Sequence, residues 1–204
     1  FNKTGQQGLN SPVCKEAVFG YTTALNFLLR SPQNHIRLDD NTVVFWAESA
    51  DKSYVNIFNL ILNTANVATS ENKSGRDRKG EEILQSTLTA IKDGRQIDRG
   101  SILNLVNGNP QFHVLGLSPN AARLSIRFYY HDPFIKAIDH LLQHHQDMLI
   151  TNEYGDQDVF PIWRIIKETV SPKAKHGKPA PLLTGAVFRS ILLNLPYPAA
   201  LYNA

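Results

Sequence analysis

Three histidines and an aspartate cluster between residues 140 and 147. His140 and His144 are four residues apart, a spacing that places both on one helix face beside His145 and Asp147. Imidazoles in that arrangement bind transition metals. A zinc protease motif also needs a glutamate directly after the first histidine, and Leu141 stands there instead. We therefore expect a solvated helix face, with no metal and no other cofactor.

Motifs for other catalytic chemistry are incomplete. His131 and Asp132 form the adjacent pair typical of metal-dependent phosphohydrolases, but that chemistry needs further histidines and aspartates. A strand end followed by Asp132 as a helix cap explains the pair. Ser118 lacks the GXSXG frame of a nucleophile, and no glycine pattern matches a nucleotide cradle. We expect no catalytic residues.

Residues 111 to 132, QFHVLGLSPNAARLSIRFYYHD, predict a β-hairpin with Pro119 and Asn120 in its turn. Strand alternation gives the second run two different faces. The face predicted for the core comprises Ala122, Leu124, Ile126, Phe128 and Tyr130. The opposite face comprises Arg123, Ser125, Arg127, Tyr129 and His131.

This second face is basic and aromatic, which suits nucleic acid. Arg123 and Arg127 carry donors for phosphates or a guanine edge, and Tyr129 offers a stacking surface. With Asn120, they are the predicted nucleic-acid contacts. An ordinary solvated or covered sheet face is an equally good interpretation of the same pattern.

A second basic segment, residues 68 to 82, has no apolar periodicity and contains two glycines. Arg76, Arg78 and Lys79 lie in it and are further candidates for phosphate contacts. Glutamates in the same segment offset part of this charge, which favours a plain surface loop.

The surrounding pattern predicts an α+β fold, with a small, mostly antiparallel sheet that includes the hairpin, several packed helices and a helical C-terminal part. Residues 41 to 48, NTVVFWAE, are apolar on both strand faces and predict a buried strand. The remaining segments with helical spacing are 16–30, the stretch from Ser53, 81–94, the stretch after Asp132, 160–169 and 182–194. We divide the chain into an α+β part, 1–132, and a helical part, 133–204, which also fit one continuous domain.

Composition is compatible with an anionic partner. The 204 residues include 21 Lys and Arg against 18 Asp and Glu, and the pI is about 9.0. The single cysteine, Cys14, cannot form an internal disulfide and fits a reducing cytoplasm. No apolar run approaches the roughly 20 residues of a membrane span, so no membrane partner is expected. The chain begins at Phe1 in a polar stretch, which suggests a fragment.

Four strings resemble the large subunits of type I-C CRISPR surveillance complexes (Cascade). They are GYTTALNFLL (20–29), NTVVFWAE (41–48), FHVLGLSPNAARLSIRFY (112–129) and PLLTGAVFRSILLNLPYPAALY (181–202). The resemblance implies an antiviral role without catalytic residues, at one end of the guide RNA complex. It also implies a longer protein, of which this chain is an internal section.

The partners implied by this resemblance are the other Cascade subunits, the guide RNA, target double-stranded DNA with its protospacer-adjacent motif, and a recruited helicase-nuclease. Two alternatives stay open. One is a metal-dependent nuclease using His131, Asp132, His140 and His144. The other is a scaffold that contacts only protein subunits.

Overall fold

A four-stranded antiparallel sheet organises the molecule in the computed structural model. Its strands are β1 (His35–Leu38), β2 (Asn41–Ala47), β3 (Gln111–Asn120) and β4 (Arg123–Pro133), in that spatial order. The structure describes residues 13–38, 40–62, 86, 89–90, 100, 102, 104–121, 123–151, 157–158, 162–171 and 177–202. The α+β class, the hairpin and the helical C-terminal part are confirmed. β1 was not predicted.

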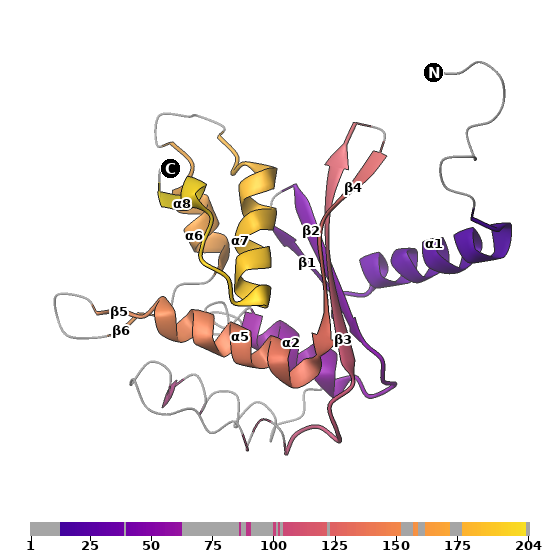
Figure 1. Cartoon of the computed structure of the whole chain (residues 1–204), viewed down its shortest axis with the longest axis horizontal. Helices are drawn as coiled ribbons and strands as arrows, with labels where there is room; N and C mark the ends of the chain where they lie inside the picture. The colour runs from indigo at the N-terminus through magenta and orange to yellow at the C-terminus, as the bar shows by residue number, and fades with distance from the viewer. Residues whose placement is uncertain are drawn as a thin grey trace.

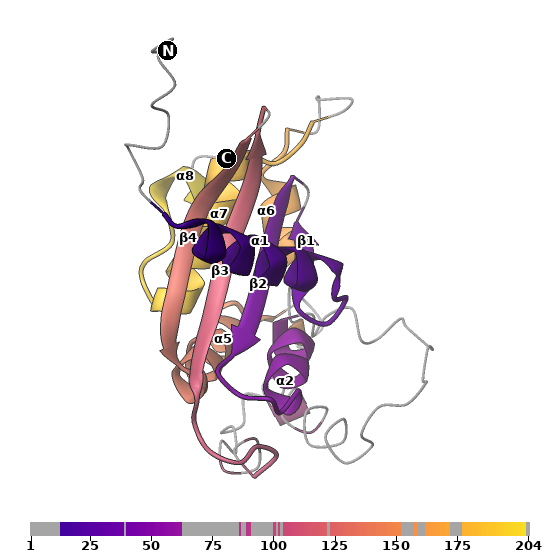
Figure 2. The ribbon, with the colours of Figure 1, turned by 90° about the vertical axis from the view of Figure 1, so that its right-hand side faces the viewer.

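Most helices cover one face of this sheet. They are α2 (Ser53–Leu62), α5 (Phe134–Asp147), α6 (Ile162–Glu168) and α7 (Pro181–Leu193), followed by the short α8 (Ala199–Tyr202). Helix α1 (Lys15–Arg30) lies on the opposite side of the sheet (Figure 1; Figure 2). The short strands β5 (Ile150–Thr151) and β6 (Gln157–Asp158) pair as a separate two-stranded antiparallel sheet. We call the face with α5 and α7 the helix face, and the face with α1 the outer face.

An aromatic cluster forms the centre of the core on the helix face. The ring of Phe58 lies 4.7 Å from that of Phe112 and 4.9 Å from that of Phe45. Phe134, the first residue of α5, contacts Phe112 at 5.3 Å and Tyr54 at 5.0 Å. Each such pair adds roughly 0.5–1.5 kcal/mol to the burial of its rings. The cluster therefore fixes α2 and α5 against the sheet.

The hairpin turn lies beyond the predicted position. Pro119 and Asn120 still belong to β3, where they pair with Leu124 and Arg123, and the chain turns only after Asn120. Ala121 adopts a left-handed conformation with φ of 52°. Proline is tolerated inside β3 because the pairing of β3 with β2 ends at Leu117, so beyond it one side of the strand has no ladder to break.

A β-bulge at Arg127 makes the predicted alternation wrong for half of β4. Gly116 pairs with Phe128 and Leu117 pairs with Ile126, so Arg127 is the extra residue. Phe128 is buried on the helix face, as predicted. Before the bulge, each residue of β4 therefore lies on the face opposite to the one predicted for it. Leu124 and Ile126, predicted for the core, are 53% and 68% exposed.

The start of α5 also differs from the prediction. Asp132 lies in β4 and does not cap the helix, and Pro133 occupies the position before the first helical residue. The Asp132 carboxylate instead forms an ion pair with Lys136 at 2.8 Å. In the part of the chain that the structure covers, no helix is long and apolar enough to cross a membrane.

Candidate nucleic-acid interface

A cavity of about 290 Å³ lies between strand β4 and helix α7. Two arginines from segments far apart in the sequence, Arg127 and Arg189, contribute to its wall. The remaining lining residues are Leu182, Gly185, Ala186, Ser190, Leu195 and Pro196. The cavity is thus lined by two arginine side chains among mostly apolar and small residues.

The bulge and a glycine together place Arg127 in this cavity. As the extra residue of β4, Arg127 turns toward α7, where its Cβ would stand 3.1 Å from a Cβ added to Gly185. Its terminal nitrogen donates to the Ser118 hydroxyl at 3.3 Å. Its Nε is buried and has no hydrogen-bond partner. The guanidinium of this cavity-lining arginine therefore carries one unsatisfied donor.

Arg189 reaches the same cavity from α7. It follows Gly185 by four residues, which places both on one face of the helix. Within the described segments, neither Arg127 nor Arg189 has a carboxylate partner. Planar guanidinium forks bind phosphate and carboxylate groups through two parallel hydrogen bonds. The pair therefore suits an anion.

The four predicted hairpin contacts do not share one face, which corrects the sequence interpretation. Tyr129 lies on the outer face, where its hydroxyl hydrogen-bonds the Nδ1 of His113 at 2.7 Å. Arg127 lies on the helix face because of the bulge. Asn120 and Arg123 pair with each other at the hairpin tip and are exposed. Arg76, Arg78 and Lys79 fall outside the described residues.

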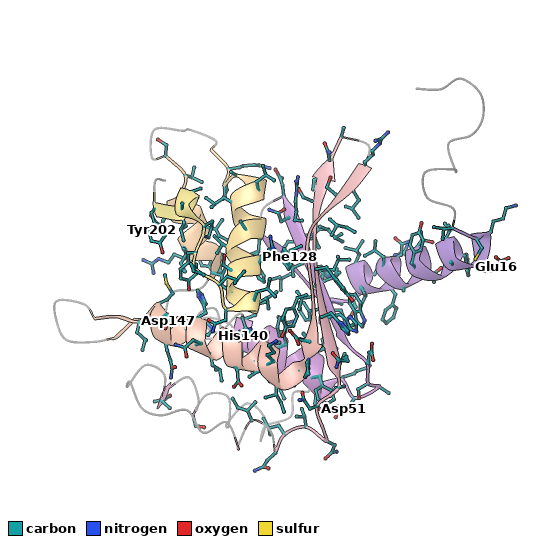
Figure 3. All side chains as sticks on the ribbon, viewed as in Figure 1. Glu16, Asp51, Phe128, His140, Asp147 and Tyr202 are labelled. Atoms are coloured by element: carbon teal, nitrogen blue, oxygen red, sulfur yellow. The ribbon has the colours of Figure 1, made fainter. Side chains whose placement is uncertain are left out.

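The histidines of the nuclease alternative are held in separate places. His131 lies on β4, where its ring stacks on that of His113. His140 Nδ1 lies 2.5 Å from the carbonyl oxygen of Leu192, so His140 faces α7 from α5 (Figure 3). His144 Nδ1 lies 2.5 Å from the Tyr197 hydroxyl. The structure therefore does not assemble these three imidazoles with Asp132 into one centre.

His144 and His145 are buried in the core, contrary to the solvated helix face that was expected. Burial, with a smaller contribution from His145, lowers the pKa of His144 to about 3. Burial also lowers the pKa of His145, whose Nε2 lies 3.0 Å from the carbonyl oxygen of Ile61. Both imidazoles are neutral at physiological pH and serve packing.

Sequence reasoning missed Arg189. It stands alone among apolar and small residues in LLTGAVFRSILLN, a helix whose other faces are largely buried. A single arginine in such a segment is the signal that could have found it. Its partner Arg127 was found, but for the wrong face.

The fold and the cavity describe an α+β protein with paired arginines able to hold an anion. Comparison with known families makes the assignment more specific. The family model described as CRISPR-associated protein (Cas_Csd1) matches residues 1–204, so the chain belongs to this CRISPR-associated family. Comparison with curated proteins gave no match.

Proposed function

We propose that this chain is a non-catalytic, nucleic-acid-binding and assembly part of the large subunit of a type I-C CRISPR surveillance complex. It acts in the cytoplasm in antiviral defence, and its partners are the other subunits, the guide RNA, target double-stranded DNA and the recruited helicase-nuclease. Membership of the Cas_Csd1 family supports the CRISPR role.

The observation that carries the binding function is the arginine pair in the β4–α7 cavity. Arg127 keeps a buried Nε without a partner, and Arg189 faces the same space. A phosphate at this position would accept hydrogen bonds from both guanidiniums while sugar or base atoms lie against Leu182 and Leu195, which are 70% and 48% exposed. Such contacts set position on a nucleic acid and do not read its sequence.

Binding to short duplex and single-stranded DNA across a salt series tests this proposal. Because each neutralised phosphate releases counterions, Arg127→Ala/Arg189→Ala should weaken duplex binding and lower the slope of log K against log salt by about 1, for the single phosphate that the two arginines share. Arg30→Ala/Arg37→Ala removes the same charge from other exposed positions and is the matched control. Equal losses in the two double variants, or no binding by the unmodified chain, would contradict the proposal.

Absence of catalysis is a separate part of the proposal. We expect no cleavage of labelled DNA or RNA with Mg²⁺, Mn²⁺ or Zn²⁺, because His131, His140 and His144 lie in separate places and do not form the catalytic centre that the nuclease alternative needs. Metal-dependent cleavage that disappears in His140→Ala would instead support the nuclease alternative.

Helix α1 favours a second candidate function, a purely protein-binding scaffold. None of its residues is buried, and Phe19 and Phe27 are 72% and 68% exposed. Large exposed apolar side chains of this kind are typical of protein contacts. If Phe19→Ser/Phe27→Ser abolishes association with the complex while the arginine variants bind normally, the scaffold interpretation is preferred.

A further inference from the structure

A row of rings crosses three strands on the outer face of the sheet. Trp46, His113 and His131 stand opposite one another on β2, β3 and β4. The rings of Trp46 and His113 lie 4.8 Å apart at an interplanar angle of 4°, and those of His113 and His131 lie 4.6 Å apart at 22°. Glu48 follows the end of β2 beside them. This row lies on the opposite side of the sheet from the arginine cavity, and its interpretation is independent of the proposed function.

Three metal-binding side chains meet in this row. One ligand atom each from Glu48, His113 and His131 lies within 4.8 Å of the other two. Among the residues that the structure describes, these three are the histidine, cysteine or acidic side chains whose ligand atoms lie close enough together to share a metal ion. His113 Nε2 and Glu48 Oε1 are already 3.0 Å apart.

To bind an ion together with His113, the His131 ring must turn out of its stack, because the nitrogen lone pairs of two nearly parallel rings lie in separate planes. Tetrahedral bonds of about 2.0–2.1 Å hold neighbouring ligand atoms roughly 3.4 Å apart. Glu48 and His131 are exposed and have room to turn, whereas His113 is 7% exposed and fixed by its neighbours. The buried imidazole would thus be the rigid ligand and the two exposed groups would close on it.

Tyr129 supports His113 in the way that metal sites require. A bound histidine usually gives its second ring nitrogen to a hydrogen-bond partner, which fixes the orientation of the ring. The Tyr129 hydroxyl lies 2.7 Å from His113 Nδ1, on the side of the ring away from the Glu48 contact at Nε2. With Nδ1 donating to this hydroxyl, the Nε2 lone pair is left for the ion.

We propose that Glu48, His113 and His131 form a binding site for a transition-metal ion of the Zn²⁺ class. Two imidazoles and one carboxylate suit Zn²⁺, Co²⁺ or Ni²⁺, whereas Ca²⁺ and Mg²⁺ prefer more oxygen ligands. The ion takes the place of the hydrogen bond between His113 Nε2 and the Glu48 carboxylate, and His113 keeps its single ring proton at Nδ1 when the ion is bound. A fourth position stays open to water. The site departs from the expectation, drawn from the sequence, that no metal is bound.

Titration of the untagged chain with Co²⁺, followed by visible absorbance, tests the site. We expect a band that saturates at one ion per chain and disappears when Zn²⁺ is added. His131→Ala and Glu48→Gln should each weaken binding by at least about tenfold, and Tyr129→Phe by about tenfold through loss of the orienting hydrogen bond. All three positions are exposed, so far-UV circular dichroism should show that each variant is folded.

Asp132→Asn is the matched control. Its carboxylate is adjacent to His131 in sequence but is paired with Lys136. This variant should bind Co²⁺ as the unmodified chain does. The proposal is overturned if no band saturates, or if His131→Ala binds as tightly as the Asp132→Asn control. Either result would identify the row as a hydrogen-bonded cluster alone.

Discussion

Phe128 lies directly over the backbone of Gly116, its partner on β3. A Cβ added to Gly116 would stand 2.2 Å from Phe128 Cε1, and the Phe128 ring is held from behind by Phe188 at 5.8 Å. Gly116→Ala should therefore lower the free energy of unfolding by about 1–3 kcal/mol, the usual range for overpacking. Urea denaturation measures this change.

Gly20→Ala is the matched control for this substitution. Gly20 lies in α1 with no atom within 4 Å of an added Cβ. Alanine there should raise the free energy of unfolding of the helix by roughly 0.5–1 kcal/mol. A Gly116→Ala protein as stable as the unmodified chain would show that the ring can move aside.

The buried histidines predict a pH dependence of stability. The pKa of His144 is lowered from 6.5 to about 3 in the folded protein, so below pH 6.5 the unfolded chain binds a proton that the folded chain does not. Stability should fall as pH falls through this window, by up to about 1.4 kcal/mol per pH unit for each such histidine. His145, with its pKa also lowered, adds to the slope.

His144→Phe should make this slope shallower by about one proton, even if the variant is less stable at every pH. Urea midpoints between pH 6.5 and 5 measure the slope before most carboxylates titrate. An identical slope in His144→Phe and the unmodified chain would mean that His144 becomes protonated in the folded state.

At the scale of single residues, sequence reasoning found only half of the candidate site. Arg127 was chosen correctly, but alternation assumed a regular strand, and a bulge depends on the pairing partner, which the local sequence does not contain. Arg189 lies 62 positions further on, and only the packing of α7 against β4 brings it to Arg127. Glu48 directly follows β2, and His113 and His131 lie on β3 and β4; the strand pairing that brings the three together is likewise absent from the local sequence.

At the scale of elements, α1 differs from the other long helices in the described part of the chain. It has no buried residue, whereas α5 and α7 supply much of the core. Its backbone amides should exchange with solvent orders of magnitude faster than those of α7 in a hydrogen-exchange experiment. Protection of α1 equal to that of α7 would show that another surface covers it in solution.

Elements were predicted well wherever the apolar period was strong. The helices near 16–30, 53–62, 162–168 and 182–193 and the strand at 41–47 follow directly from spacing. β1 was missed because HIRL is short and only half-buried, so it carries almost no period. The hairpin turn was misplaced because Pro119 looks like a turn residue, and its tolerance within β3 depends on where β2 ends.

At the scale of the whole molecule, one core contains residues from both parts of the chain divided at residue 132. Phe112 contacts Phe134, and Phe128 contacts Phe188. We expect the two parts to unfold together, since neither can keep its apolar surface buried without the other.

The two tryptophans test this cooperativity. Trp163→Phe leaves Trp46 as a reporter of the first part, and Trp46→Phe leaves Trp163 as a reporter of the second. In each variant the midpoint from fluorescence should equal the midpoint from far-UV circular dichroism. Two separated transitions would establish two independent folding units.

The bulge at Arg127 has one more consequence, which concerns self-association. Strand β4 is at the edge of the sheet, and a long edge strand is a template on which a strand from another molecule can add. Such growth needs backbone donors and acceptors at regular spacing, and the extra residue at position 127 breaks that spacing in mid-strand. The kink that turns Arg127 toward α7 therefore also protects this edge against aggregation.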